Sequence, residues 1–467
     1  MSSLPRSTPE AQGLSAAALD SFVAALDASE QEIQTLMLVR HGHVVLEEEW
    51  SPYRLADRHL LFSVSKSFTS MGIGLLVDGG QLSLDDKVVS FFDDDELPDK
   101  ISDNLAAMEI RHLLTMTTGH SQDTIEALSR DNRMVRTFLS LDVDHQPGTV
   151  FVYNTGATYT LSAILQKLTG ETLLDYLRPR LFEPLGAAEA TWEISKEGIT
   201  KGGWGLSLST DSLARFGQLL LQRGEWEGNQ LIPAAWIDAA TSKQVPNDNQ
   251  ENPDWQQGYG FQFWRGRNGT YRGDGAFGQY CLIFPEHDTA LIVTSASQNM
   301  QATLDVVWEH LVPALRGEAG AGPARPEKLE IPAPEGPVGP PPSGDGRSYR
   351  FDPNHAALSA VRLDPDGTGT FTFEVGPHHE TSVPIGTTQD VVCAPGGWQE
   401  LTDDLQDPPQ RLLTSAFADG DAFVATFRYL ETPYVATLTC RPDGEALTVD
   451  VNFNVSFGPT KFALRST

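Results

Sequence analysis

The sequence predicts an α+β protein in which an antiparallel sheet is flanked by helices, followed by a C-terminal all-β, barrel-like domain. Three observations lead to this prediction. Strand patterns occur near both ends of the first 315 residues, and helical periodicity fills the stretch between them. Short alternating runs separated by turn residues then fill residues 346–467.

Proline and glycine mark the boundary between the two parts. Residues 316–345 are rich in both and include Pro340-Pro341-Pro342, so they offer little to bury and are expected to form an extended linker. We therefore predict a mixed helix-and-sheet domain at residues 1–315, a linker at 316–345 and a β domain at 346–467.

The elements of the first part follow from their periodicity. A hairpin is expected around His41-Gly42-His43, between apolar runs at residues 33–39 and 44–50. Helices are expected at residues 65–77, 158–168, 173–181, 213–223 and 299–315, and late strands at 278–284 and 290–295. Ser209-Thr210-Asp211 supplies N-cap chemistry ahead of the fourth of these helices.

The second part shows five short alternating runs, at residues 360–363, 370–375, 422–429, 434–441 and 446–453. Turn clusters such as Asp364-Pro365-Asp366-Gly367 separate them, and regular short strands with turns predict a barrel or a sandwich.

Composition excludes several functional classes. A formal net charge of −30, with no basic run, disfavours binding to nucleic acid or to anionic membranes. Three widely spaced cysteines argue against a disulfide framework and a structural zinc site, and no metal or nucleotide motif occurs. We expect no cofactor and no metal. The N-terminus lacks a signal-peptide pattern, so a cytoplasmic location is expected.

The strongest chemical signal is the pair Ser63 and Lys66. Ser63 ends an apolar run at the start of a predicted helix, where backbone N–H groups and the helix dipole favour a developing oxyanion. Lys66 lies one turn later on the same face and can reach the Ser63 hydroxyl. Serine needs a base to become a nucleophile, and burial must lower the lysine pKa before its amine can serve.

Several segments in order strengthen this signal. Phe62-Ser63-Val64-Ser65-Lys66 resembles the nucleophile motif of the serine β-lactamase and penicillin-binding-protein superfamily, especially its class-C-like esterase branch. Residues 110–119 resemble that family's LLTHTSG stretch, residues 147–154 its PGTxFxYSN stretch, and the resemblance covers roughly residues 8–315. It implies a β-lactamase/transpeptidase-like fold and a covalent acyl-enzyme.

The resemblance implies a second catalytic residue, Tyr153, in a Tyr-x-Asn motif. A phenol beside a cationic lysine is expected to have a lowered pKa and to pass protons between serine and leaving group. The chain departs from the motif because Thr155 stands in its third position, so either Asn154 or Thr155 supplies the polar contact. Tyr159 is an alternative base.

The family's third motif, Lys-Thr-Gly or a variant, matches Gly273-Asp274-Gly275-Ala276 with a register uncertain by one residue. A backbone N–H near Gly275 or Ala276 is expected to complete an oxyanion hole with that of Ser63. Neither Asp274 nor Gly273 supplies the family's cation, which Arg272 would have to replace. Loss of that cation shifts the expected substrate towards esters or amides without a carboxylate.

A Ser-His-Asp triad is the obvious rival, but the chain has no GxSxG elbow. His120, just after Thr117-Thr118-Gly119, is instead expected to line the pocket. The leading hypothesis is thus a serine hydrolase with a Ser63-Lys66-Tyr153 centre that cleaves a small ester or amide substrate. D-amino-acid peptidase and β-lactamase activities are the alternatives, and a catalytically inactive ligand-binding homologue is the alternative of another class. The residues leave open whether the C-terminal domain covers the site or joins copies of the chain in a homo-oligomer.

Overall fold

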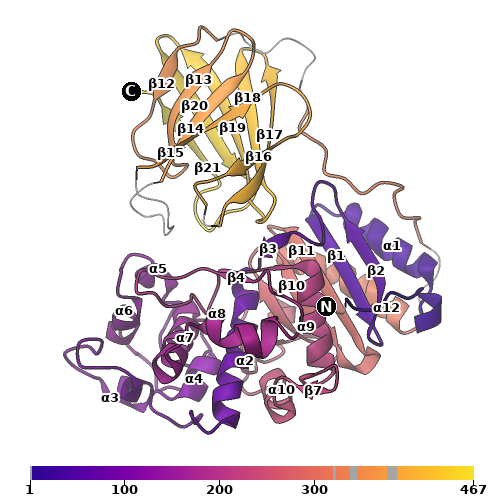
Figure 1. The fold of residues 1–467 in the computed structure, drawn as a ribbon, viewed down its shortest axis with the longest axis vertical. Helices are drawn as coiled ribbons and strands as arrows, with labels where there is room; N and C mark the ends of the chain where they lie inside the picture. The colour runs from indigo at the N-terminus through magenta and orange to yellow at the C-terminus, as the bar shows by residue number, and fades with distance from the viewer. Residues whose placement is uncertain (1–2, 319–321, 337–343, 376–385, 407) are drawn as a thin grey trace. The chain divides into compact units, whose positions relative to one another are not determined.

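The computed structural model describes residues 3–318, 322–336, 344–375, 386–406 and 408–467 (Figure 1). The chain forms two compact units. Unit 1 consists of Met1–Glu49 and Arg54–Lys328, whereas unit 2 consists of Trp50–Tyr53 and Leu329–Thr467.

Unit 1 is built on a six-stranded antiparallel sheet, which confirms the predicted fold class. In spatial order its strands are β2 (His43–Glu49), β1 (Glu32–Arg40), β11 (Thr289–Ala296), β10 (Gln279–Phe284), β9 (Tyr271–Gly275) and β8 (Trp264–Arg265). The N-terminal hairpin thus lies beside strands from the end of the unit, with Leu36 opposite Val293 in the register. Strand β9 is thus the second strand from one edge of the sheet, beside the short edge strand β8.

Helices cover both faces of this sheet. Helix α9 (Thr210–Leu221), capped by the Ser209 side chain, packs on one face, where a Cβ at Gly217 would lie 3.0 Å from the Ala290 Cβ. The other face carries α1 (Ala16–Asp27) together with α11 (Met300–Val306), η7 (Val307–Leu311) and α12 (Val312–Leu315). There the Phe284 ring meets the Trp308 ring edge-on.

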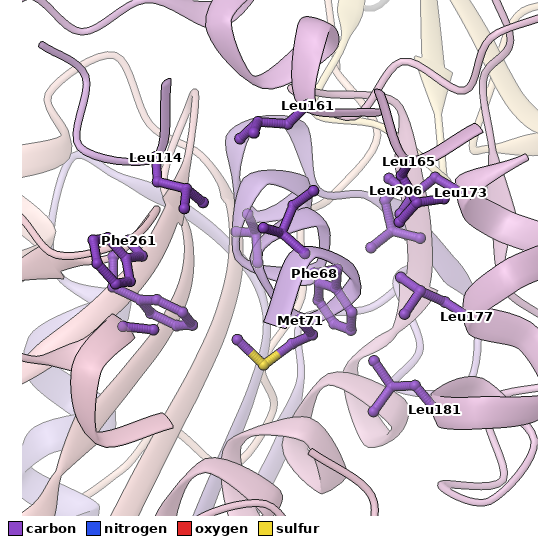
Figure 2. Close-up of a cluster of buried hydrophobic side chains, with 14 of the residues drawn as sticks. Phe68, Met71, Leu114, Leu161, Leu165, Leu173, Leu177, Leu181, Leu206 and Phe261 are labelled. Atoms are coloured by element: carbon purple, nitrogen blue, oxygen red, sulfur yellow. The ribbon is translucent and has the colours of Figure 1, made fainter. Parts of the chain in front are cut away.

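A helical layer surrounds α2 (Ser65–Asp78), the helix that begins just after Ser63. Figure 2 shows Phe68 and Met71 of α2 amid leucines from α7 (Thr155–Thr169) and α8 (Leu173–Leu177). Helix α10 (Ala234–Thr241) approaches so closely that a Cβ at Gly74 would lie 2.4 Å from the Trp236 ring. This fully buried packing holds the start of α2 in place.

Short elements complete unit 1. A small antiparallel sheet consists of β3 (Arg58–Leu60), β5 (Leu206–Ser209) and β4 (Thr191–Trp192), and its strand β3 ends three residues before Ser63. The remaining elements are η1 (Glu10–Gln12), η2 (Phe62–Val64), η3 (Val88–Phe91), α3 (Asp103–Ala107), α4 (Ile110–Leu114), α5 (Ile125–Leu128), α6 (Met134–Ser140), η4 (Arg178–Phe182), β6 (Glu225–Trp226), β7 (Asn229–Gln230), η5 (Pro253–Trp255) and η6 (Pro285–His287). Among the helices that the structure describes, none has both the length and the apolar composition that a membrane crossing requires.

Unit 2 is all β but differs from the barrel-like form that we expected. One sheet has the order β12 (Ser348–Arg350), β13 (Leu358–Leu363), β14 (Gly369–Glu374) and β15 (Thr388–Cys393). The other contains β16 (Gln399–Asp403), β17 (Gln410–Asp419), β18 (Ala422–Tyr429), β19 (Val435–Asp443), β20 (Ala446–Phe453) and β21 (Lys461–Arg465). In the described residues neither sheet closes on itself. The Phe371 ring of one sheet lies edge-on to the Phe427 ring of the other, so two open sheets share one apolar core.

Candidate active site

Ser63 lies in the short 3-10 helix η2, between strand β3 and helix α2. The residue before it, Phe62, has φ = 46°, a left-handed conformation that costs energy for a bulky residue. Its ring packs edge-on to the ring of Phe277, at 5.4 Å between centroids, and Phe277 is itself left-handed with φ = 64°. The backbone is therefore strained directly beside the candidate nucleophile, as is common where a reacting group must be held in one position.

Lys66 is buried, with 1% of its surface exposed. Its Nζ lies 2.9 Å from Ser63 Oγ, 2.8 Å from the carbonyl oxygen of Gly203 and 3.4 Å from Thr155 Oγ1. Burial lowers the pKa of Lys66 to about 8, although the carboxylates of Asp123 and Asp274 act in the opposite direction. A substantial part of this amine is therefore neutral at mildly alkaline pH, as a base for Ser63 must be.

Tyr153 precedes helix α7 and meets both Ser63 and Lys66. Its hydroxyl lies close enough to the Ser63 side chain for that group to act on its pKa, and Lys66 Nζ lies 4.8 Å from the centre of its ring. The ring also stacks on Trp264, at 5.1 Å and 24°. Contrary to our expectation of a lowered value, burial and then the Asp274 carboxylate raise the pKa of Tyr153. The phenol is therefore neutral and suited to donate a hydrogen bond.

Strand β9 runs in contact with residues 61–67, the segment that carries Ser63 and Lys66, and glycine makes this approach possible. A Cβ at Gly275 would lie 2.1 Å from the carbonyl oxygen of Leu61, and one at Gly273 would lie 2.8 Å from Ser67 Oγ. The Leu61 oxygen belongs to the backbone, so position 275 requires glycine, whereas a Cβ at position 273 would displace the Ser67 hydroxyl. Ala276 follows the strand and is half-buried.

Arg272 and Asp274, which alternate with these glycines along β9, form a buried ion pair. Arg272 Nε lies 2.9 Å from Asp274 Oδ2, and the two side chains are 0% and 6% exposed. The Arg272 guanidinium also donates to the carbonyl oxygen of Asp254 at 3.0 Å and lies 4.6 Å from the centre of the Trp255 ring. Burial raises the pKa of Asp274, and Arg272 opposes that rise. Arg272 is thus engaged inside the protein, and the position nearest the family's cation carries a carboxylate.

Asn154 and His120, which we expected at the substrate, lie in a buried polar network behind Tyr153. The Asn154 side-chain oxygen accepts from Thr124 Oγ1 at 2.7 Å, and its amide nitrogen lies 3.4 Å from Thr118 Oγ1. Thr118 Oγ1 in turn lies 2.9 Å from His120 Nδ1. Asn154 and His120 are 0% and 2% exposed, and burial lowers the pKa of His120 to about 4. This network fixes the turn that leads into α7.

Tyr159, the alternative base, faces a different group of residues. Its hydroxyl lies 2.8 Å from Ser195 Oγ and 2.9 Å from Glu197 Oε2. These contacts connect α7 to the loop after β4, so the Tyr159 hydroxyl is hydrogen-bonded to that loop.

Two residues that contact the candidate site were not predicted from the sequence. Gly203 supplies its carbonyl oxygen to Lys66, and a Cβ there would lie 2.8 Å from Thr155 Cγ2. The adjacent Gly202-Gly203 pair was the available signal of such a close approach. Asp123 accepts from the Thr155 hydroxyl at 2.9 Å, and nothing in its sequence neighbourhood indicated that contact.

Within the described residues, one group of carboxylates has the spacing of a metal site: Asp93, Asp95 and Glu96. Lys167 Nζ already lies 3.4 Å from Asp93 Oδ2 and 2.6 Å from Glu96 Oε2. This surface group is therefore an ion-pair network, which gives no reason to assign a metal.

A buried amine within hydrogen-bond reach of a serine hydroxyl is an arrangement that can activate the serine as a nucleophile. Comparison with known proteins gives the family. The Beta-lactamase family model matches residues 19–312. The chain is 24% identical over 306 residues to the 6-aminohexanoate-dimer hydrolase of Paenarthrobacter ureafaciens, which covers 60% of this chain and 77% of that one. It is 26% identical over 171 residues to the lovastatin esterase of Penicillium rubens, covering 31% of this chain and 42% of that one.

A solved structure is similar over nearly the whole chain. The octameric penicillin-binding protein homologue from Pyrococcus abyssi matches with a TM-score of 0.53 at 16% identity, covering 96% of this chain and 99% of that one. The protein described here belongs to the Beta-lactamase family and is a serine hydrolase.

Proposed function

We propose that the protein hydrolyses a small ester or amide through an acyl-enzyme on Ser63, with Lys66 and Tyr153 moving the protons. The observation that supports this most strongly is the 2.9 Å contact between the buried Lys66 Nζ and Ser63 Oγ. A nucleophile needs its base within hydrogen-bond reach, and this base has a pKa of about 8.

In the first step, Ser63 Oγ attacks the substrate carbonyl carbon while its proton passes to the neutral Lys66 amine. The carbonyl π electrons move to oxygen, and the N–H of Ser63 with an N–H near Gly275 or Ala276 stabilises that oxyanion. The tetrahedral intermediate collapses, the bond to the leaving group breaks, and the Tyr153 phenol donates the proton that the leaving group needs. The Lys66 ammonium then restores the phenol proton, so that the acyl-enzyme forms with both groups neutral.

In the second step, water adds to the acyl carbon and loses a proton to the neutral Lys66 amine. Collapse of the second intermediate breaks the bond to Ser63 Oγ, which recovers its proton from Lys66. The net reaction consumes one water and releases an acid and an alcohol or amine, with no co-reactant.

Asp274 bears on the class of substrate. A carboxylate stands where the family has a cation, and Arg272 is engaged with it at 2.9 Å. A substrate carboxylate at this position would meet like charge, so the site favours an ester or linear amide that is uncharged there. The names of the relatives, a 6-aminohexanoate-dimer hydrolase and a lovastatin esterase, agree with amide and ester substrates. D-amino-acid peptides and β-lactams rank behind them.

The test is hydrolysis of a panel of p-nitrophenyl esters, anilides, D-Ala-D-Ala peptides and a chromogenic cephalosporin. Ser63→Ala should abolish turnover of every substrate that the wild type cleaves. Ser70→Ala is the matched control, because Ser70 is a buried serine of α2, the helix that begins just after Ser63, and its Oγ has no hydrogen-bond partner in the described structure. Turnover that survives Ser63→Ala would contradict the proposal. A wild type inactive on the whole panel, and unreactive with a fluorophosphonate, would favour the ligand-binding homologue.

Assembly is a separate proposal. We infer that the chain forms a homo-oligomer to which the β domain at residues 346–467 contributes, because the relative that spans both parts is octameric. Sedimentation velocity of the full chain should give a species larger than the 51.0 kDa monomer. A monomer at micromolar concentration would contradict this inference.

A further inference from the structure

Asp123 forms a set of contacts that reaches Lys66 through Thr155. Asp123 Oδ1 accepts from the backbone N–H groups of Ile125 at 3.1 Å and Thr155 at 2.8 Å. Its other oxygen, Oδ2, accepts from the Thr155 hydroxyl at 2.9 Å. An ionised carboxylate has no hydrogen to donate, so the single hydroxyl hydrogen of Thr155 must point at Asp123.

This direction decides what Thr155 offers to Lys66. With its hydrogen committed to Asp123, Thr155 Oγ1 can only accept from Lys66 Nζ, 3.4 Å away. The carbonyl oxygen of Gly203, 2.8 Å from the same nitrogen, can also only accept. Two of the three hydrogen-bond neighbours of the amine can therefore only accept a hydrogen bond from it.

A neutral amine has two hydrogens and one lone pair. If Gly203 and Thr155 take the two hydrogens, the lone pair is left for the third neighbour, Ser63 Oγ, at 2.9 Å. Ser63 must then donate its hydrogen to Lys66, and this is the geometry from which the proton is transferred.

We propose that Asp123 is a positioning residue, which orients the Thr155 hydroxyl so that the Lys66 lone pair faces Ser63. The inference rests on the proposed function of Ser63 and Lys66 and adds a residue that touches neither the substrate nor the reacting atoms.

Asp123→Asn should reverse the arrangement with little change of shape. The amide oxygen remains where two backbone N–H groups point, so the new NH₂ group replaces Oδ2 and donates to Thr155 Oγ1. The Thr155 hydroxyl then turns towards Lys66 and donates to the lone pair, in competition with Ser63. We expect kcat on an aryl ester to fall by about 10- to 100-fold, within the range that a general base contributes.

A double-mutant cycle tests whether Asp123 acts through that hydroxyl. Thr155→Val should lower kcat about as much as Asp123→Asn, and Thr155→Ser should retain activity. In the Thr155→Val background, Asp123→Asn should have almost no further effect. A second loss as large as the first would overturn the inference, as would an Asp123→Asn variant with wild-type kcat. Because both Thr155 variants keep the carboxylate, they test the hydroxyl even where Asp123→Asn folds poorly.

Asp131→Asn is the matched control for the amide substitution. Asp131 Oδ1 accepts from the N–H of Arg133 at 3.0 Å and its Oδ2 accepts from the Thr137 hydroxyl at 2.8 Å, the same local pattern at an exposed position. This variant should keep wild-type kcat.

The pH profile provides a readout that a purely structural role would not move. The charged groups that act on Lys66 are Asp123 and Asp274, the latter paired with Arg272. Removing the Asp123 charge should shift the acid limb to lower pH while the plateau falls. Ser63→Ala separates the two claims: if it is active, the proposed function fails, whereas an inactive Ser63→Ala with an unaffected Asp123→Asn refutes only this inference.

Discussion

Deprotonation of Lys66 should govern acylation, and its buried environment sets the pH at which this occurs. Only the neutral amine can take the Ser63 proton, so kcat/KM follows the deprotonated fraction. Burial lowers the pKa of Lys66 to about 8. That fraction is then about one half at pH 8 and about one hundredth at pH 6, so kcat/KM should rise about 50-fold between them. Above about pH 9 the profile should level off.

The assay is kcat/KM for an uncharged aryl ester between about pH 5.5 and about pH 10, corrected for spontaneous hydrolysis. The high pKa of Tyr153, raised by burial, adds no second rise within most of this range. Lys66→Met should remove the rise of kcat/KM with pH and leave slow turnover that is nearly independent of pH. A rate that keeps rising tenfold per pH unit to about pH 10 would mean that the amine has its unperturbed pKa, which would refute the reasoning.

Three further predictions concern strand β9. Gly275→Ala places a Cβ 2.1 Å from the Leu61 carbonyl oxygen, so it should destabilise the fold by about 1–3 kcal/mol and lower kcat, as measured by thermal unfolding and ester turnover. An unchanged Tm would contradict the close approach. Arg272→Met leaves the buried Asp274 carboxylate without its cation and should cost about 3–5 kcal/mol in urea unfolding; a loss below about 1 kcal/mol would argue against a buried pair. Asp274→Asn removes the negative charge that would repel a substrate carboxylate. The ratio of kcat/KM for an uncharged ester to kcat/KM for its carboxylate-bearing analogue should therefore fall several-fold relative to the wild type. An unaltered ratio would show that Asp274 does not determine which substrate the protein prefers.

Local patterns in the sequence predicted much of the fold. The helix expected at residues 65–77 is α2 (Ser65–Asp78), and the strand expected at 446–453 is β20 (Ala446–Phe453). Such elements follow from periodicity and capping, which depend on residues near one another in the chain. Whether the last strands close into a barrel or form two sheets depends on long-range pairing; the sequence left a barrel and a sandwich open, and only the preference for a barrel-like form was wrong.

In the candidate site too, contacts between residues close in the sequence were predicted and contacts between distant residues were not. Ser63 in η2 and Lys66 in the first turn of α2 lie three residues apart, so sequence spacing predicted their contact, which the structure has at 2.9 Å. Gly203 and Asp123 reach the same centre from 137 and 32 positions away from their partners, Lys66 and Thr155. No local pattern encodes such contacts. The pKa of Tyr153 was predicted in the wrong direction because burial and the Asp274 carboxylate of strand β9, neither of which a local pattern shows, raise it.

The central claim is that Ser63 is the nucleophile, and covalent trapping tests it most directly. The full chain is incubated with a fluorophosphonate at about pH 8.5, where most of the Lys66 amine should be neutral, and the adduct is mapped by peptide mass spectrometry. We predict a single label on the peptide that contains Ser63, retained in Ser70→Ala and absent from Ser63→Ala. A label on another peptide, or one that persists in Ser63→Ala, would contradict the account.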